Sequence, residues 1–134
     1  MNRTILFVLL FALFVLPVTC AFADSGNDDL LSNKIVGTWV MHKKNDYAEM
    51  YGETNYKDDG SFQSDGYFIF DGEKSMIEFS GNWSIKEGVL TEDVKKSNTP
   101  EISGASQFRV LSISDKHYNF ISLKSGEADY ATRK

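Results

Sequence analysis

Cysteine, proline and histidine are scarce in this chain of 134 residues, which has one cysteine, two prolines and two histidines. The single cysteine, Cys20, has no second cysteine to pair with. A disulfide within the chain is therefore excluded, and stability must come from core packing. The length is enough for one domain and too short for two comfortable cores.

Basic residues are outnumbered by acidic ones, 14 to 19, so the formal net charge is −5 at pH 7. All 19 acidic residues lie after residue 23, together with every basic residue except Arg3. Nucleic-acid binding needs a basic stripe and docking on anionic lipid needs basic side chains, so the charge argues against both partners. We interpret the acidic surplus as a contribution to solubility.

A long apolar run occurs only near the N-terminus, over residues 5–16. It is shorter than the roughly 20 residues that a membrane-spanning helix needs. A basic residue precedes it, a proline ends it, and Ala21 and Ala23 provide the small side chains that a signal peptidase reads. The sequence therefore predicts a secretory signal peptide over residues 1–23, cleaved after Ala23, and a periplasmic or secreted protein. A lipoprotein anchored through Cys20 is the alternative, and the residues before Cys20 fit that pattern poorly.

Past the signal peptide no segment shows sustained helical periodicity, and short runs of alternating apolar and polar residues are separated by turn residues. Glycine and aspartate turns at residues 57–60, 71–73 and 86–88 join neighbouring runs. The clearest run places apolar or small residues at every second position: Ile77, Phe79, Gly81, Trp83 and Ile85. About eight short strands with tight connections predict an all-β domain with antiparallel neighbours.

Residues 34–134 are expected to form a single antiparallel up-and-down β-barrel, since closure removes the exposed edges of an open sheet. A two-sheet sandwich is the competitor, but only residues 97–106 provide a connection long enough for its crossovers. The strands at 107–114 and 117–123 carry apolar residues on both faces, so their inward face is not assigned. Residues 24–33 are either a flexible segment or a short helix.

Three features resemble lipocalins and small bacterial lipocalin-like (calycin-type) domain proteins. Residues 37–39 are similar to the Gly-x-Trp signature of a first strand, and the hairpins at 59–62 and 81–88 are similar to those of the bacterial proteins. Arg133 stands where lipocalins often place an arginine across the first-strand tryptophan. The resemblance implies a barrel that binds a small apolar molecule, although the chain is short for a lipocalin and lacks the family's second motif and disulfide. The residues expected to close the barrel are Gly37, Trp39, Trp83 and Arg133.

The barrel interior is the first candidate site. Its expected inward positions carry aromatic side chains and a methionine, a lining that suits an apolar ligand. The candidate ligand-binding residues are Met50, Tyr56, Phe62, Phe68, Phe70 and Phe79. An eight-stranded barrel is just wide enough either to be filled by side chains or to hold one small ligand, so a filled core is the alternative.

Other chemistries find weaker support in the sequence. His117 lies beside Asp115 in a tight turn, but no spacing brings a serine, a base and an orienting group together. We therefore predict no catalytic residues and no enzyme activity. Asp58, Asp59 and Asp65 lack the terminal bidentate glutamate of a calcium loop, and hairpin turns account for them. We expect no metal and no cofactor.

The combined prediction is an exported, monomeric binding module for a small apolar ligand, without a nucleic-acid partner and without a membrane span after signal cleavage. The alternative is a periplasmic inhibitor or adaptor that binds a protein partner through its N-terminal arm, residues 24–33, or through the rim loops. The two hypotheses differ in where function lies, inside the barrel or at its arm and rim.

Overall fold

The structure is a computed structural model that describes residues 25–134. The predicted signal peptide, its cleavage position after Ala23 and the residue Cys20 lie outside the described residues. Within residues 25–134, no helix combines the length and the apolar character needed to cross a membrane.

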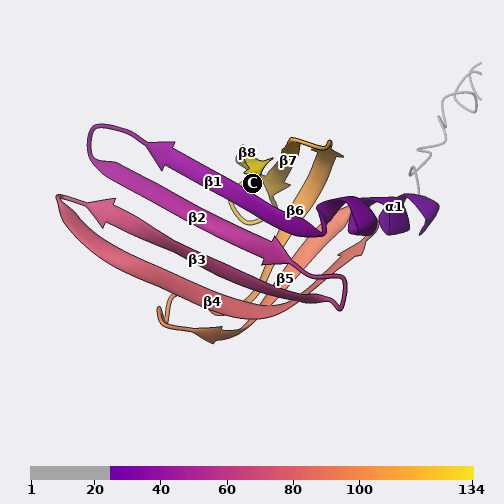
Figure 1. Cartoon of the computed structure of the whole chain (residues 1–134), viewed down its shortest axis with the longest axis horizontal. Helices are drawn as coiled ribbons and strands as arrows, with labels where there is room; N and C mark the ends of the chain where they lie inside the picture. Colours follow the sequence, from indigo (N-terminus) through magenta and orange to yellow (C-terminus); the bar gives the residue numbers. More distant parts are fainter. Residues whose placement is uncertain (1–24) are drawn as a thin grey trace, which may run out of the picture.

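One helix precedes eight strands, each of which pairs with the next, and the last strand pairs with the first (Figure 1). The result is a closed antiparallel barrel, which confirms the predicted up-and-down architecture and not the sandwich. The helix is α1 (Ser25–Ile35), in the region where the sequence left a helix and a flexible segment open. The strands are β1 (Gly37–Lys44), β2 (Ala48–Tyr56), β3 (Ser61–Phe70), β4 (Glu73–Lys86), β5 (Val89–Ser97), β6 (Gly104–Ile113), β7 (His117–Ser122) and β8 (Ala128–Arg133).

Two tight turns set the register of strands β3, β4 and β5. Asp71-Gly72 joins β3 to β4 and Glu87-Gly88 joins β4 to β5, and all four residues have positive φ, from 49° to 78°. Two-residue loops with both φ values positive match the right-handed twist of the flanking strands. The turn chemistry of the sequence therefore determines which residues of these strands face each other.

The hydrophobic core occupies one end of the barrel, which we call the closed end. Its buried side chains come from α1 and from every strand except β4: Ile35, Trp39, Tyr56, Phe62, Leu90, Ile113, Tyr118, Phe120 and Ala131. Helix α1 packs against β4 and β6 at this end. The Asp28 carboxylate accepts hydrogen bonds from the backbone N–H groups of Glu87 and Gly88, at 2.7 and 2.9 Å, which ties the helix to the β4–β5 turn.

Arg133 joins the end of the chain to the start of the barrel. Its guanidinium carbon lies 4.3 Å from the centroid of the Trp39 ring. Its Nη2 and Nη1 atoms donate to the carbonyl oxygens of Lys34 and Val36, at 2.6 and 3.0 Å. The Trp39 Nε1 atom donates to the Ile35 carbonyl at 2.6 Å. These bonds satisfy carbonyl groups at the helix end that have no partner within the helix.

The glycine of the Gly-x-Trp sequence has a steric reason to be there. Gly37 has a φ of 129°, a backbone conformation that residues with a side chain rarely adopt. A Cβ atom at this position would lie 2.5 Å from Arg133 Nη1. Gly37 therefore leaves room for the guanidinium that covers Trp39.

A β-bulge assigns the inward face of β6, which the sequence left open. Pairing with β7 shifts between Val110 and Ser112, so Phe108 and Val110 face inward, and so does Ile113 three residues later. Leu111 is correspondingly exposed, at 53%. Strand β6 also begins at Gly104, within the segment expected to be a loop.

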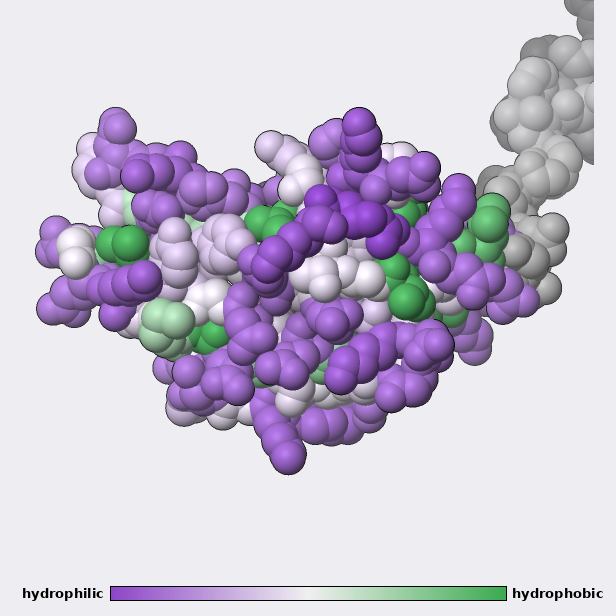
Figure 2. All heavy atoms as spheres, in the orientation of Figure 1, coloured by the Kyte–Doolittle hydropathy of each residue, from purple (hydrophilic) through white to green (hydrophobic). Residues whose placement is uncertain are grey.

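Strands β1–β4 extend beyond β5–β8 at the open end (Figure 1). We call this projecting part, residues 45–49 and 68–76, the lip. It holds several of the most exposed large apolar side chains, among them Tyr47 at 80%, Met76 at 63% and Phe70 at 59%. Figure 2 shows that the visible face of the molecule is mostly hydrophilic, with apolar residues in small separate patches.

Candidate functional site

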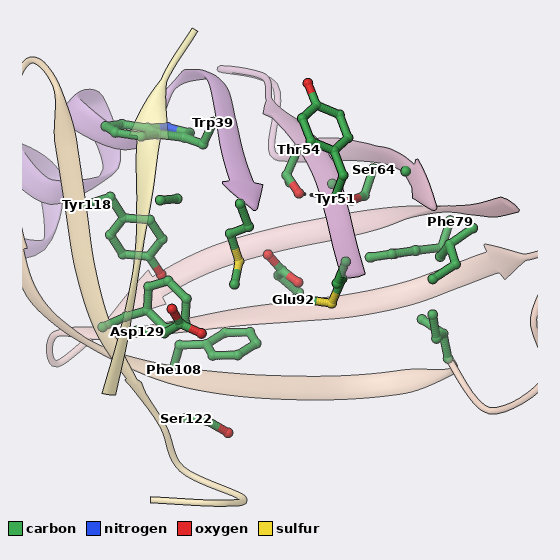
Figure 3. A pocket seen from close by; sticks show the side chains of 18 of the residues that line it. Trp39, Tyr51, Thr54, Ser64, Phe79, Glu92, Phe108, Tyr118, Ser122 and Asp129 are labelled. Atoms are coloured by element: carbon green, nitrogen blue, oxygen red, sulfur yellow. Dashed lines mark hydrogen bonds between the residues drawn. The ribbon is translucent and has the colours of Figure 1, made fainter. Parts of the chain in front are cut away.

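The interior of the barrel is not completely filled. Above the core, toward the open end, lies a cavity of about 360 Å³. Inward side chains of all eight strands line it, including Met41, Thr54, Ser64, Ile77, Phe79, Glu92, Phe108, Tyr118, Phe120 and Asp129 (Figure 3). The alternative of a completely filled core is therefore wrong for this end of the barrel.

The floor of the cavity carries a carboxyl group. Glu92 is the next inward position on β5 after Leu90, which is fully buried in the core. The Tyr56 hydroxyl, from β2 on another part of the barrel wall, donates a short hydrogen bond to Glu92 Oε1. Figure 3 shows the Glu92 carboxyl group near the centre of the cavity, between the walls that carry Thr54 and Tyr118.

Burial changes the acidity of the groups on this floor. It raises the pKa of Glu92 above the usual 4.5, although the hydrogen bond from Tyr56 opposes the shift. Burial, followed by the charge of Glu92, also raises the pKa values of Tyr56 and Tyr118. Both phenols therefore stay protonated and can act as hydrogen-bond donors.

The walls are apolar and aromatic, with one neutral polar pair. Phe108 and Phe120 pack edge to face, with ring centroids 5.4 Å apart, and Tyr118 stacks on Phe120 at 4.8 Å. On the opposite wall the Thr54 and Ser64 hydroxyls lie 2.9 Å apart and share a hydrogen bond. A small apolar molecule would find both packing surface and few unsatisfied polar groups on these walls.

Two glycines widen the cavity. Gly52 on β2 faces Gly66 on β3, and both line the space. A Cβ atom at Gly52 would meet nothing within 4 Å, so a larger side chain there would project into open volume. A Cβ atom at Gly66 would instead lie 2.1 Å from the Tyr51 carbonyl oxygen, so Gly66 is required by the close approach of the backbone.

The rim of the cavity is polar on one side and apolar on the other. Asp129 on β8 forms a salt bridge with Lys43 on β1. On the lip, the Phe68 and Phe70 rings stack with centroids 6.3 Å apart. Apolar surface therefore continues from the cavity to the open end of β3.

The structure separates the six predicted ligand-binding residues into three groups. Met50, Tyr56 and Phe79 line the cavity. Phe62 is 2% exposed and belongs to the core beneath it. Phe68 and Phe70 lie on the lip, 37% and 59% exposed, because β5–β8 do not reach far enough to cover them.

The four predicted barrel-closing residues lie at the closed end. Arg133 covers Trp39 beside Gly37, as described above. Trp83 packs edge to face on Tyr56, and its Nε1 atom donates to the Lys57 carbonyl at 2.9 Å. Trp83 therefore joins the β2–β3 turn to β4.

Sequence reasoning missed Glu92, the most distinctive group in the cavity. The signal was present, because Glu92 alternates in phase with Leu90 and Val94 and so had to face inward with them. It also missed the wall residues Phe108 and Phe120, because their strands carry apolar residues on both faces and alternation alone did not assign the inward one. The two histidines lie elsewhere: the His42 ring contacts Glu49 Oε1 at 3.0 Å outside the barrel, and His117 packs edge to face on Tyr130.

A closed eight-stranded antiparallel barrel, with a helix at its closed end and a cavity inside, has the architecture of a lipocalin-like ligand-binding module. The sequence profile of the Lipocalin-like domain family matches residues 35–120 of the chain. The chain therefore belongs to this family, which confirms the resemblance seen in the sequence. A comparison with curated proteins finds no match.

Proposed function

We propose that this protein is an exported binding module that holds a small, mainly apolar ligand inside the barrel. The observation that carries the proposal is the cavity of about 360 Å³, which has aromatic walls and leads to an apolar lip. Pockets of roughly 300–1,000 Å³ with apolar walls and a few polar groups are typical of small-molecule sites.

A role without catalysis is part of the proposal. No histidine is among the residues that line this cavity, and its hydroxyl pair, Thr54 and Ser64, is engaged internally. Glu92 is held by Tyr56 and lies beside no nucleophile that forms a hydrogen bond with it within residues 25–134. The polar groups of the cavity are thus arranged to bind and orient a ligand.

The alternative, a protein partner engaged by an N-terminal arm, receives less support. Residues 25–35 form a helix, and Asp28 ties that helix to the β4–β5 turn. An arm that inserts into a partner's cleft would have to leave these contacts. We therefore favour the cavity over the arm as the functional site.

A cavity-filling variant tests the proposal. Retinol and octanol, both neutral, are titrated into the wild type and into Gly52→Leu, with retinol fluorescence and calorimetry as readouts. Because the space around Gly52 is open, we expect Gly52→Leu to fold normally and to weaken binding by about tenfold or more. Asn55→Leu is the matched control, since it adds the same side chain to the exposed outer face of β2.

Two results would count against the proposal. One is a folded wild type that binds neither probe saturably. The other is equal binding by Gly52→Leu and Asn55→Leu, with unchanged thermal melts, which would place the binding outside the barrel. Export is tested separately by the intact mass of the exported protein, which we expect to begin at Asp24 and not at a lipid-modified Cys20.

A further inference from the structure

The charged residues that line the cavity are all acidic. Lysine, arginine and histidine are absent from its lining within the described residues, whereas Glu92, Glu127 and Asp129 line it, as does the strand position of Asp65, whose side chain faces outward. Lys43 pairs with Asp129 at the rim, and Gln63 donates to Asp65 at 3.2 Å on the outer face of β3. Glu92 is the acidic group that lies deep inside.

Only one of the two carboxyl oxygens of Glu92 has a hydrogen-bond partner within the described residues. The bond from Tyr56 engages Oε1, and it is the single hydrogen bond that the carboxyl group forms within residues 25–134. The second oxygen, Oε2, is available to a ligand in the cavity. A buried carboxylate is costly unless it is paired with a cation or fully hydrogen-bonded. A ligand that supplies the missing donor would remove this cost.

The surroundings of Glu92 also favour positive charge. Tyr118, Phe120 and Phe108 present aromatic rings to the same space, and aromatic faces attract cations. A fatty-acid carboxylate would meet Glu92 with no basic group to compensate the repulsion. The cavity therefore discriminates between ligands of equal apolar size by the charge of their head group.

We propose that the ligand is an apolar amine whose protonated nitrogen pairs with Glu92 while its hydrocarbon part extends along Phe79 and Phe108 toward the lip. This inference rests on the proposed function of the same cavity. The Tyr56 hydroxyl positions the carboxylate by holding Oε1, and Oε2 accepts from the ammonium group. The stacked rings of Phe68 and Phe70 continue the apolar surface for a chain that is longer than the cavity.

Three probes with one chain and different head groups test the inference. Octylamine is cationic, octanol neutral and octanoate anionic at neutral pH, and calorimetry measures their affinities for the wild type. We expect octylamine to bind most tightly and octanoate most weakly. In Glu92→Gln we expect octylamine binding to fall by about tenfold or more, as loss of a charge-assisted hydrogen bond predicts, while octanol binding changes little.

Glu78→Gln is the matched control, because it makes the same change of charge on the exposed outer face of β4. It should leave all three affinities unchanged. Amide chemical shifts of the cavity residues on addition of octylamine show whether the probe enters the barrel. Glu92→Gln is nearly isosteric and keeps an acceptor for Tyr56, and thermal melts verify its folding.

The outcomes separate the two proposals. Octanol binding in the cavity with equal or tighter octanoate binding would overturn the amine inference and leave the proposed function standing. The same holds if Glu92→Gln and Glu78→Gln bind octylamine equally well. Failure of all three probes to bind a folded wild type would overturn both.

Discussion

Arg133 offers the most direct test of how the barrel is closed. Its guanidinium group covers Trp39 and donates three hydrogen bonds to backbone carbonyls, from Nη2 to Lys34 at 2.6 Å, from Nη1 to Val36 at 3.0 Å and from Nε to Asp115 at 3.1 Å. The planar fork of arginine makes this set of bonds feasible. Arg133→Lys keeps the positive charge and removes the fork.

The expected loss can be worked out from these contacts. An ammonium group in the same place reaches one of the three carbonyls, so two hydrogen bonds are lost, at about 0.5–1.5 kcal/mol each. Poorer contact with the indole face costs about 0.5 kcal/mol more, because the side chain is partly exposed. We expect Arg133→Lys to lower the free energy of unfolding by about 1.5–3.5 kcal/mol. A domain of this kind has about 5–15 kcal/mol in total.

Urea denaturation followed by tryptophan fluorescence measures this change. Arg109→Lys is the control, because Arg109 is exposed on β6 and the same substitution there should stay within about 0.5 kcal/mol. Hydrogen exchange should also show reduced protection in α1, whose last carbonyl groups lose their partners. Equal stability of the two variants would refute the reasoning about the fork.

Three further predictions concern stability. Trp39→Ala should lower the free energy of unfolding by about 3–5 kcal/mol in urea denaturation, because it leaves a cavity in the core; a loss below about 1 kcal/mol would contradict this. Asp28→Ala should cost about 1–2 kcal/mol and increase amide exchange at Gly88, because two charge-assisted bonds disappear; unchanged exchange would show that α1 is held by packing alone. Burial raises the pKa of Glu92 in the folded state above its unfolded value of 4.5. The wild type therefore loses stability as the pH rises from the unfolded pKa through the folded-state pKa. Denaturation curves should therefore show Glu92→Gln more stable than the wild type near about pH 7, with the advantage gone below about pH 4; a constant difference would argue against the shifted pKa.

Three of the residues at the closed end, Gly37, Trp39 and Arg133, could be predicted from the sequence because they match features that lipocalins carry on their first and last strands. Gly-x-Trp on a first strand and an arginine on the last strand are recognisable without coordinates. The structure adds the reason for them: the guanidinium group needs the space that a Cβ atom at Gly37 would occupy.

The candidate site was only partly predictable. Met50, Tyr56 and Phe79 line the cavity, and alternation along their strands had already assigned each of them the inward face. The same reasoning put Phe68 and Phe70 inside. They face the interior by register but lie on the lip, because the strands across the barrel are too short to cover them. Strand length relative to a distant strand is not a local property of the sequence.

The sequence by itself determined the approximate number of the strands, their order and the turns between them, because side-chain alternation and turn chemistry act over a few neighbouring residues. It favoured a closed barrel over a sandwich, and the structure confirms the closure. Only the tertiary structure decided that the barrel holds a cavity and that Glu92 lies on its floor. An empty volume depends on where opposite walls meet, and here Gly52 faces Gly66 on one side while a bulge turns Phe108 and Val110 inward on another. The bond from Tyr56 to Glu92 joins residues 36 positions apart, and no local pattern specifies such a contact.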